Sequence, residues 1–158
     1  SSFPNINMLS ATVVYSTWQN CSSLSAFPAI NMPNATQLYG AWRSCKNLTS
    51  FPHISTQNVT EFSYAWFDCT GLNNTNFPKL DMNKMKYTNG VFQGGAGCFG
   101  GVTLSTTSYS NLLIDLAANN TNTNVVFDGG NSKYNTSAAT ARATLAGRGW
   151  SITDGGPV

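Results

Sequence analysis

The chain has 158 residues, a formal net charge of +2 and only 9% charged residues, against about a quarter in ordinary soluble domains. This length suits one domain with a single core. Because the sequence has no run of Lys or Arg and no apolar stretch near the roughly 20 residues that span a bilayer, we expect no nucleic-acid partner and no membrane insertion.

Phe-Pro pairs recur along the first part of the chain. The pairs that begin at Phe3, Phe27 and Phe51 recur with a period of 24 residues, and the pair at Phe77 follows after a slightly longer interval. Positions that recur with this period are called columns below. Three further columns hold Trp18, Trp42, Trp66 and the variant Phe92; Cys21, Cys45 and Cys69; and Leu24, Leu48 and Leu72. Regular recurrence over such a distance is the signature of a repeat architecture.

Each repeat is predicted to form a strand, a turn and a short helix. Residues 24–30 place apolar side chains where a short strand turns them inward, and Leu38, Trp42 and Cys45 have the spacing of one helical face. Asn58 is expected to cap such a helix. Since a single repeat cannot bury its own apolar side chains, neighbours are expected to stack into a parallel solenoid.

The period ends in the glycine-rich segment 94–101, and the rest of the chain is predicted to form an α/β cap. The expected elements are strands at 102–104, 124–127 and 150–153 and helices at 108–118 and 137–146. We therefore expect a repeat solenoid over residues 1–102 and a C-terminal cap over residues 103–158 that packs on the solenoid end.

The pattern F-P-x-I followed by A-W-x-x-C-x-x-L-T resembles the BspA-like, or Treponema-type, leucine-rich repeats of bacterial and phage surface proteins. Segments 41–49 and 65–72 match it closely, with Trp where the family has Phe. The segment 135–156 is similar to a C-terminal segment of phage tail-fibre proteins. The resemblance implies an α/β fold with a short right-handed leucine-rich-repeat solenoid of about four 24-residue repeats, and a role in adhesion.

The residues that could carry chemistry favour binding over catalysis. His53 is the single histidine, so a His-based nucleophilic triad would depend on it alone. Asp128 and Asp154 each precede Gly-Gly, an ordinary turn sequence, and the alternative is a carboxylate pair for glycoside hydrolysis or calcium. With no C-x-x-C and no nucleotide-binding glycine motif, we expect no enzyme, no cofactor and no metal site.

Two columns leave alternatives open. The threonine column that begins at Thr12 is expected to place a capping or turn hydroxyl at each helix start, and an ice-binding threonine array is the alternative. The cysteines are expected to be free buried thiols, and disulfides between neighbouring repeats are the alternative. They are Cys21, Cys45, Cys69 and Cys98.

Aromatic side chains that the core does not need are candidates for ligand contact, because exposed rings stack on sugars and anchor interfaces. The candidate ligand-binding residues are Tyr15, Tyr39, Tyr64 and Tyr87. The competing interpretation is that these rings only cover the edge of the core.

The expected function is non-catalytic surface recognition, as a phage tail-fibre or tip domain that binds a bacterial surface receptor, with a glycan as the expected ligand. The alternative is a bacterial cell-surface leucine-rich-repeat adhesin that binds host matrix protein or another cell. Either location is extracellular, on a virion tail or a bacterial surface. Because the sequence begins within a repeat, we also expect it to belong to a larger chain or assembly.

Overall fold

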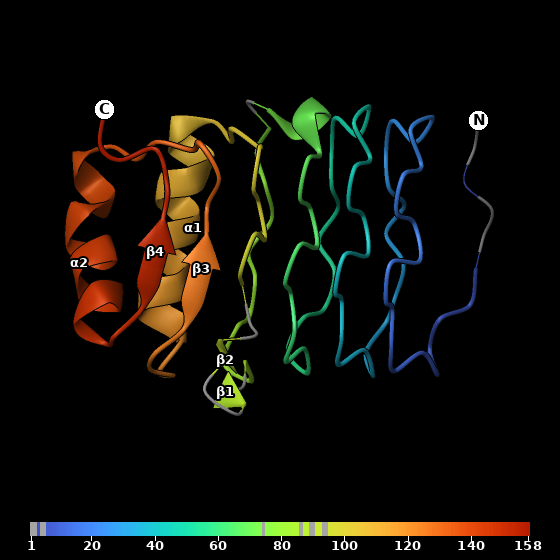
Figure 1. Cartoon of the computed structure of the whole chain (residues 1–158), viewed down its shortest axis with the longest axis horizontal. Coiled ribbons are helices and arrows are strands. Elements are labelled where there is room, and N and C mark those ends of the chain that lie inside the picture. Colours follow the sequence, from blue (N-terminus) through green and yellow to red (C-terminus); the bar gives the residue numbers. More distant parts are fainter. Residues whose placement is uncertain (1–2, 4–5, 74, 86, 89–90, 93–94) are drawn as a thin grey trace.

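The computed structural model describes residues 3, 6–73, 75–85 and 95–158, together with the backbone of residues 87–88 and 91–92. Figure 1 shows a row of stacked backbone turns that ends in two helices and two strands. By the Phe-Pro period, we call residues 3–26 coil 1, residues 27–50 coil 2, residues 51–76 coil 3 and residues 77–102 coil 4.

Backbone hydrogen bonds join each coil to the next in parallel register. From coil 1, the N–H groups of Val14, Ser16, Trp18 and Asn20 donate to the carbonyls of Gln37, Tyr39, Ala41 and Arg43. From coil 2, the N–H groups of Leu38, Gly40, Trp42 and Ser44 donate to the carbonyls of Glu61, Ser63, Ala65 and Phe67. All eight N···O distances lie between 2.8 and 2.9 Å, and all eight bonds have the same separation along the chain.

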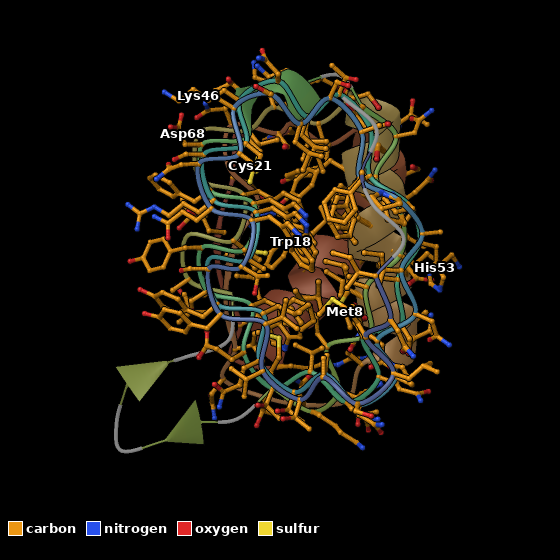
Figure 2. All side chains as sticks on the ribbon, turned by 90° about the vertical axis from the view of Figure 1, so that its right-hand side faces the viewer. Met8, Trp18, Cys21, Lys46, His53 and Asp68 are labelled. Carbon is orange, nitrogen blue, oxygen red and sulfur yellow. The ribbon has the colours of Figure 1, made fainter. Side chains whose placement is uncertain are left out.

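The chain between the ladder segments of coils 3 and 4 is longer than the chain between those of the earlier coils. The Gly40 N–H donates to the Ser63 carbonyl, whereas the Tyr64 N–H donates to the Ala96 carbonyl, so the second step along the chain is nine residues longer. Strands β1 (Tyr87–Thr88) and β2 (Val91–Phe92) lie in this extra length and pair in antiparallel fashion. Figures 1 and 2 show this hairpin projecting from the stack. An insertion in one repeat thus leaves the register of the stack intact.

The coils differ from the predicted strand–turn–helix repeat. Over the described residues before Thr106, the only helical element is the 3-10 helix η1 (Thr70–Leu72). Two positions in each of the first three coils have a left-handed backbone, which an α-helix cannot include. They are Ser16, Gly40 and Tyr64, with φ of 50°, 59° and 58°, and, four residues later, Asn20, Ser44 and Asp68, with φ of 62°, 60° and 59°.

The predicted helix cap at Asn58 is therefore wrong. The Asn58 side chain does not accept a helical N–H; its Nδ2 donates to the Pro33 carbonyl of the preceding coil at 2.8 Å. Asn34 makes the equivalent bond to the Leu9 carbonyl, also at 2.8 Å. Asn34 and Asn58 thus form hydrogen bonds between neighbouring coils. Their spacing along the chain is equally compatible with a helix cap, which is why the sequence suggested one.

Two aromatic columns fill the inside of the stack. Rings of Trp18, Trp42, Trp66 and Phe99 stack nearly parallel, with centroids 5.4, 5.3 and 5.2 Å apart. Rings of Phe27, Phe51 and Phe77 form the second column at 5.4 and 5.5 Å. The columns meet edge to face, which is a favoured aromatic geometry. The fourth place of the tryptophan column thus belongs to Phe99, and its assignment to Phe92 was wrong because the insertion displaces the period.

The cap continues the ladder beyond coil 4. Gly95 bridges Phe127 of β3 (Val126–Asp128), and β3 pairs in parallel with β4 (Ser151–Thr153). Helix α1 (Thr106–Asn119) connects coil 4 to β3, while η2 (Thr136–Ala138) and α2 (Ala139–Gly147) connect β3 to β4 (Figure 1). The cap elements agree with the predicted ones except at 102–104, where the structure has no strand.

Local sequence explains why α1 forms in the cap. The Ser105 hydroxyl accepts the Ser108 N–H at 3.2 Å and caps the helix start, and Leu112, Leu113 and Leu116 are buried on one face. No helix in the described parts of the chain is both long enough and apolar enough to cross a membrane.

The tryptophan column predicts that replacing Trp42 by Phe costs less stability than replacing it by Ala. The buried Trp42 Nε1 has no hydrogen-bond partner among the described residues, so Trp42→Phe removes no hydrogen bond and places the Phe99 side-chain type in the same column. We expect Trp42→Phe to cost less than about 2 kcal/mol of unfolding free energy, and Trp42→Ala about 3–5 kcal/mol. Urea denaturation followed by circular dichroism measures both values, and equal losses would contradict this account.

Candidate functional site

Three of the four predicted tyrosines come together on the outside of the stack. Tyr15 is 59% exposed, and Tyr39 and Tyr64 are half-buried. The ring centroids of Tyr15 and Tyr39 are 4.7 Å apart with an interplanar angle of 6°, and those of Tyr39 and Tyr64 are 5.6 Å apart at 68°. The backbone of Tyr87 lies in β1, and its side chain lies outside the described part of the structure.

The stacking decides which ring surfaces a ligand could reach. One face of the Tyr39 ring stacks on Tyr15, and Tyr39 also meets the ring of Tyr64 edge to face. Among the described residues, Tyr15 has a ring partner on one side only. A sugar ring could therefore stack on Tyr15, whereas Tyr39 and Tyr64 offer ring edges and hydroxyl groups. The sequence did not distinguish these roles.

Tyr64 occupies a different position in its coil from Tyr15 and Tyr39. The ladder aligns Tyr15 and Tyr39 with Ser63, which is buried, and it aligns Tyr64 with Ser16 and Gly40. Tyr64 therefore has the left-handed backbone of that column, with φ of 58°. A bulky side chain is uncommon in this conformation, which costs an L-residue about 1–2 kcal/mol.

Two neighbouring residues complete the site, and sequence reasoning missed both. The Arg43 guanidinium carbon lies 5.6 Å from the ring centroid of Tyr64 and 5.2 Å from that of Phe67, which is within cation–π range. Phe67 also packs edge to face on Tyr64 at 5.6 Å. Both residues directly follow a core Trp, so the period could have identified them. We call Tyr15, Tyr39, Tyr64, Phe67 and Arg43 the tyrosine face.

Glycines of coil 4 support one end of the tyrosine face. A Cβ added at Gly97 would lie 2.6 Å from the ring of Tyr64, and one at Gly100 would lie 2.7 Å from the ring of Phe67. Either distance is too short for a carbon contact, so any larger residue there would displace the ring. The glycine-rich segment thus lets two aromatic rings lie directly on the backbone of the next coil.

The carboxylates near the tyrosine face have partners within the protein. Asp68 Oδ2 lies 3.2 Å from Lys46 Nζ and accepts the Ser44 hydroxyl at 3.3 Å. Glu61 Oε1 accepts the Ser63 N–H at 2.7 Å. Figure 2 shows Lys46 and Asp68 on one side of the coils and His53 on the opposite side. The single histidine therefore lies away from these carboxylates.

The residues considered for catalysis have structural contacts. Asp128 Oδ1 accepts the Gly130 N–H at 2.8 Å, as expected for a turn. Asp154 Oδ2 accepts the Tyr109 hydroxyl at 2.9 Å and the Arg142 Nε–H at 2.8 Å, so this carboxylate joins α1, α2 and the segment after β4. Within the described residues, no group of three or more His, Cys, Asp or Glu side chains could hold a metal ion.

The threonine column contributes to the ladder between coils. The hydroxyls of Thr36 and Thr60 donate to the carbonyls of Thr12 and Thr36 at 2.9 and 3.1 Å, and the backbone N–H groups of the same residues donate to the same carbonyls. The hydroxyl protons of Thr36 and Thr60 are therefore used between coils, and neither residue begins a helix.

The four cysteines are thiols in the structure, and they are not equivalent. Cys45 and Cys69 are buried and donate S–H to the carbonyls of Trp18 and Trp42 at 3.0 and 2.9 Å. Cys98 is also buried, and this burial, together with the nearby carboxylate of Asp128, raises the pKa of its thiol. Cys21 is exposed, so its predicted burial was wrong: it lies in coil 1, near the end of the stack away from the cap.

The different burial of the thiols predicts their reactivity. Because the thiolate must be both formed and accessible to react, Cys21 should react with a thiol reagent in the native protein, and Cys45, Cys69 and Cys98 should react only after unfolding. Absorbance after addition of an aromatic disulfide reagent counts the reactive thiols, with the Cys21→Ser variant as the control. Fast reaction of a second thiol in native protein would contradict the packing described here.

The left-handed backbone at Tyr64 predicts that a Gly variant is more stable than an Ala variant at this position, the reverse of the usual order. We expect Tyr64→Gly to be about 1 kcal/mol more stable than Tyr64→Ala, because only glycine occupies this conformation without steric cost. At Tyr39, which is not among the residues of positive φ, the Ala variant should be the more stable by roughly 0.5–1 kcal/mol. Chemical denaturation of the four variants tests both orders, and the same order at both positions would refute the strained conformation.

Comparison with known proteins gave no match: no protein-family model fits the chain, and searches of curated proteins and of solved structures found nothing similar. What the chain does must therefore be argued from the tyrosine face and the fold that holds it.

Proposed function

We propose that this chain is a non-catalytic recognition module that binds a saccharide on a bacterial surface through its tyrosine face, as a phage tail-fibre or tip domain does. The stacked coils are, in this proposal, a short right-handed solenoid of BspA-like leucine-rich repeats closed by the C-terminal cap. The observation that carries the proposal is the cluster of Tyr15, Tyr39 and Tyr64, with rings 4.7 and 5.6 Å apart on the outer surface.

The core does not require these tyrosines. Its interior is filled by the Trp and Phe columns, whose members are at most 9% exposed, whereas Tyr15 is 59% exposed. Exposed aromatic side chains are common anchors of binding interfaces. Aromatic rings with hydroxyl groups suit sugars, which present apolar ring faces for stacking and hydroxyl groups for hydrogen bonds.

The backbone at Tyr64 supports a role outside folding. The equivalent positions in coils 2 and 4 are Gly40 and Gly97, which adopt the left-handed conformation without steric cost. Tyrosine at this position costs stability, and residues held in sparsely populated conformations cluster at binding sites. Tyr64 contacts both Tyr39 and Phe67, so the residue with the strained backbone is also at the centre of the tyrosine face.

The site is also preorganised. Tyr39 and Tyr64 lie where the coils are joined by backbone hydrogen bonds: the Tyr39 carbonyl accepts the Ser16 N–H at 2.9 Å, and the Tyr64 N–H donates to the Ala96 carbonyl at 3.0 Å. A ligand that meets a rigid surface loses less binding free energy to ordering the protein. Together with a sequence that has no run of Lys or Arg, this favours a hydroxyl-rich saccharide over nucleic acid.

The experiment is binding of the fluorescently labelled chain to a panel of whole bacterial cells, before and after periodate oxidation of their surface sugars, with immobilised matrix proteins alongside. We expect strain-selective binding that periodate removes. Binding to matrix proteins alone would replace the proposal with a bacterial adhesin, and absence of binding to every cell and protein would remove the tyrosine face as a receptor site.

Substitutions then locate the site. The double variant Tyr39→Ala/Tyr64→Gly should bind the selected cells at least about tenfold more weakly, which corresponds to about 1.4 kcal/mol. Glycine at position 64 keeps the left-handed backbone free of strain. The matched control is Tyr134→Ala on the cap, because Tyr134 also stacks under an arginine, with Arg142 Cζ 5.6 Å from its ring centroid. Equal loss of binding in the control would show that the tyrosine face is not the site.

A further inference from the structure

Arg43 differs from the other arginines in what its guanidinium contacts. Arg142 donates to both carboxylate oxygens of Asp154, and Arg148 donates to the carbonyls of Ala117 and Asn120. Arg43 instead lies over the rings of Tyr64 and Phe67, and its guanidinium makes no hydrogen bond or ion pair with the described residues. Its five N–H donors are therefore not used by oxygen acceptors of this part of the fold.

The two rings hold the guanidinium in place. Phe67 and Tyr64 contact each other at 5.6 Å, and Gly97 and Gly100 leave no room for these rings to move toward coil 4 without contact with the backbone. A cation–π contact uses none of the N–H groups of a guanidinium as hydrogen-bond donors, so these remain available to a ligand. The contacts with both rings restrict the position of the Arg43 guanidinium before any ligand arrives.

The nearby carboxylates do not take up these donors. Asp68 is paired with Lys46 and accepts the Ser44 hydroxyl, and Glu61 accepts the backbone N–H of Ser63. Coil 1 and most of coil 2 contribute no charged side chain, since the sequence has no Lys, Arg, Asp or Glu before Arg43. On this surface the cation without an anionic partner among the described residues is therefore Arg43.

We propose that the tyrosine face selects acidic saccharides, and that Arg43 binds the anionic group of the sugar while the tyrosines contact its ring and hydroxyls. This inference rests on the proposed function and adds the ligand class. The planar fork of an arginine matches a carboxylate or a phosphate with two parallel N–H···O bonds, which are stronger than bonds to a neutral hydroxyl. Neutral saccharides contact the same tyrosines without this bond and bind more weakly.

The test uses surface polysaccharide purified from a strain that binds the chain in the cell experiment. One portion is left native, a second has its carboxylates reduced to primary alcohols, and a third has its phosphate esters removed. Isothermal titration calorimetry against the full chain then gives an affinity for each portion. We expect one of the two treatments to weaken binding at least about tenfold, which identifies the anionic group as carboxylate or phosphate.

Variants assign the effect to Arg43. Arg43→Gln should weaken binding of the native polysaccharide by about the same factor as the effective chemical treatment, and it should leave binding of the treated polysaccharide unchanged. The control is Lys46→Gln, which removes a neighbouring cation that is already paired with Asp68. Circular dichroism of both variants establishes that the fold is retained.

The outcomes separate this inference from the proposed function. If neither treatment changes the affinity, or if Arg43→Gln binds as the wild type does, the acidic-ligand inference is overturned while saccharide binding stands. If the purified polysaccharide does not bind in any form, both proposals fail together.

Discussion

The stacking of the coils and the aromatic columns inside them depend on the backbone hydrogen bonds between coils. Each coil donates N–H groups to carbonyls of the next coil, and the bonds continue through Gly95 into β3 and β4. Because each coil needs its neighbours to satisfy its polar backbone, a coil cannot form alone, which is the behaviour of quasi-one-dimensional repeat proteins. The parallel register also superimposes equivalent side chains, so the aromatic columns follow from the backbone pairing.

The parallel register of the coils explains which features of the fold could be predicted from the sequence. The period of the Phe-Pro pairs identified the buried Trp and Phe columns of coils 2 and 3 correctly, because equivalent positions share one environment where a coil has a neighbour on both sides. The cap helices were also predictable, since Leu112, Leu113 and Leu116 mark an apolar face and Ser105 a cap. Over these stretches, local sequence preference and tertiary contacts favour the same structure.

The predicted helix in each repeat was wrong because hydrogen bonds between coils take the place of hydrogen bonds within a helix. Leu38, Trp42 and Cys45 have helical spacing, yet the intervening backbone is left-handed at Gly40 and Ser44, and alternate N–H groups of this stretch bond to coil 3. Spacing alone does not separate a helix from a series of turns whose donors are satisfied by a neighbour. The same limit applies to Phe92, because the length of an insertion is visible in the sequence and its position in the ladder is not.

The tyrosine face could be predicted only in part. The sequence identified its tyrosines by their type, but the one-residue offset that moves Tyr64 into the left-handed column depends on the register with Ser63. Arg43 and Phe67 were overlooked because neither residue type is unusual beside a core Trp. Their relation is three-dimensional: a cation from one coil lies over rings from the next. The period could have assigned Arg43 and Phe67 to equivalent positions of neighbouring coils, but it does not give the contact of the cation with the rings.

The additional length between the ladder segments of coils 3 and 4 has a practical consequence for protein engineering. The ladder bonds that Tyr64, Trp66 and Asp68 donate to coil 4 and β3 have N···O distances of 3.0, 3.0 and 2.7 Å, close to the 2.8–2.9 Å between the coils without an insertion. The closure of a coil therefore does not depend on its contour length at that corner. Loop closure entropy changes slowly with length, and exposed corners tolerate insertion. The corresponding corners of coils 2 and 3 are therefore suitable points for grafting foreign peptides onto this scaffold.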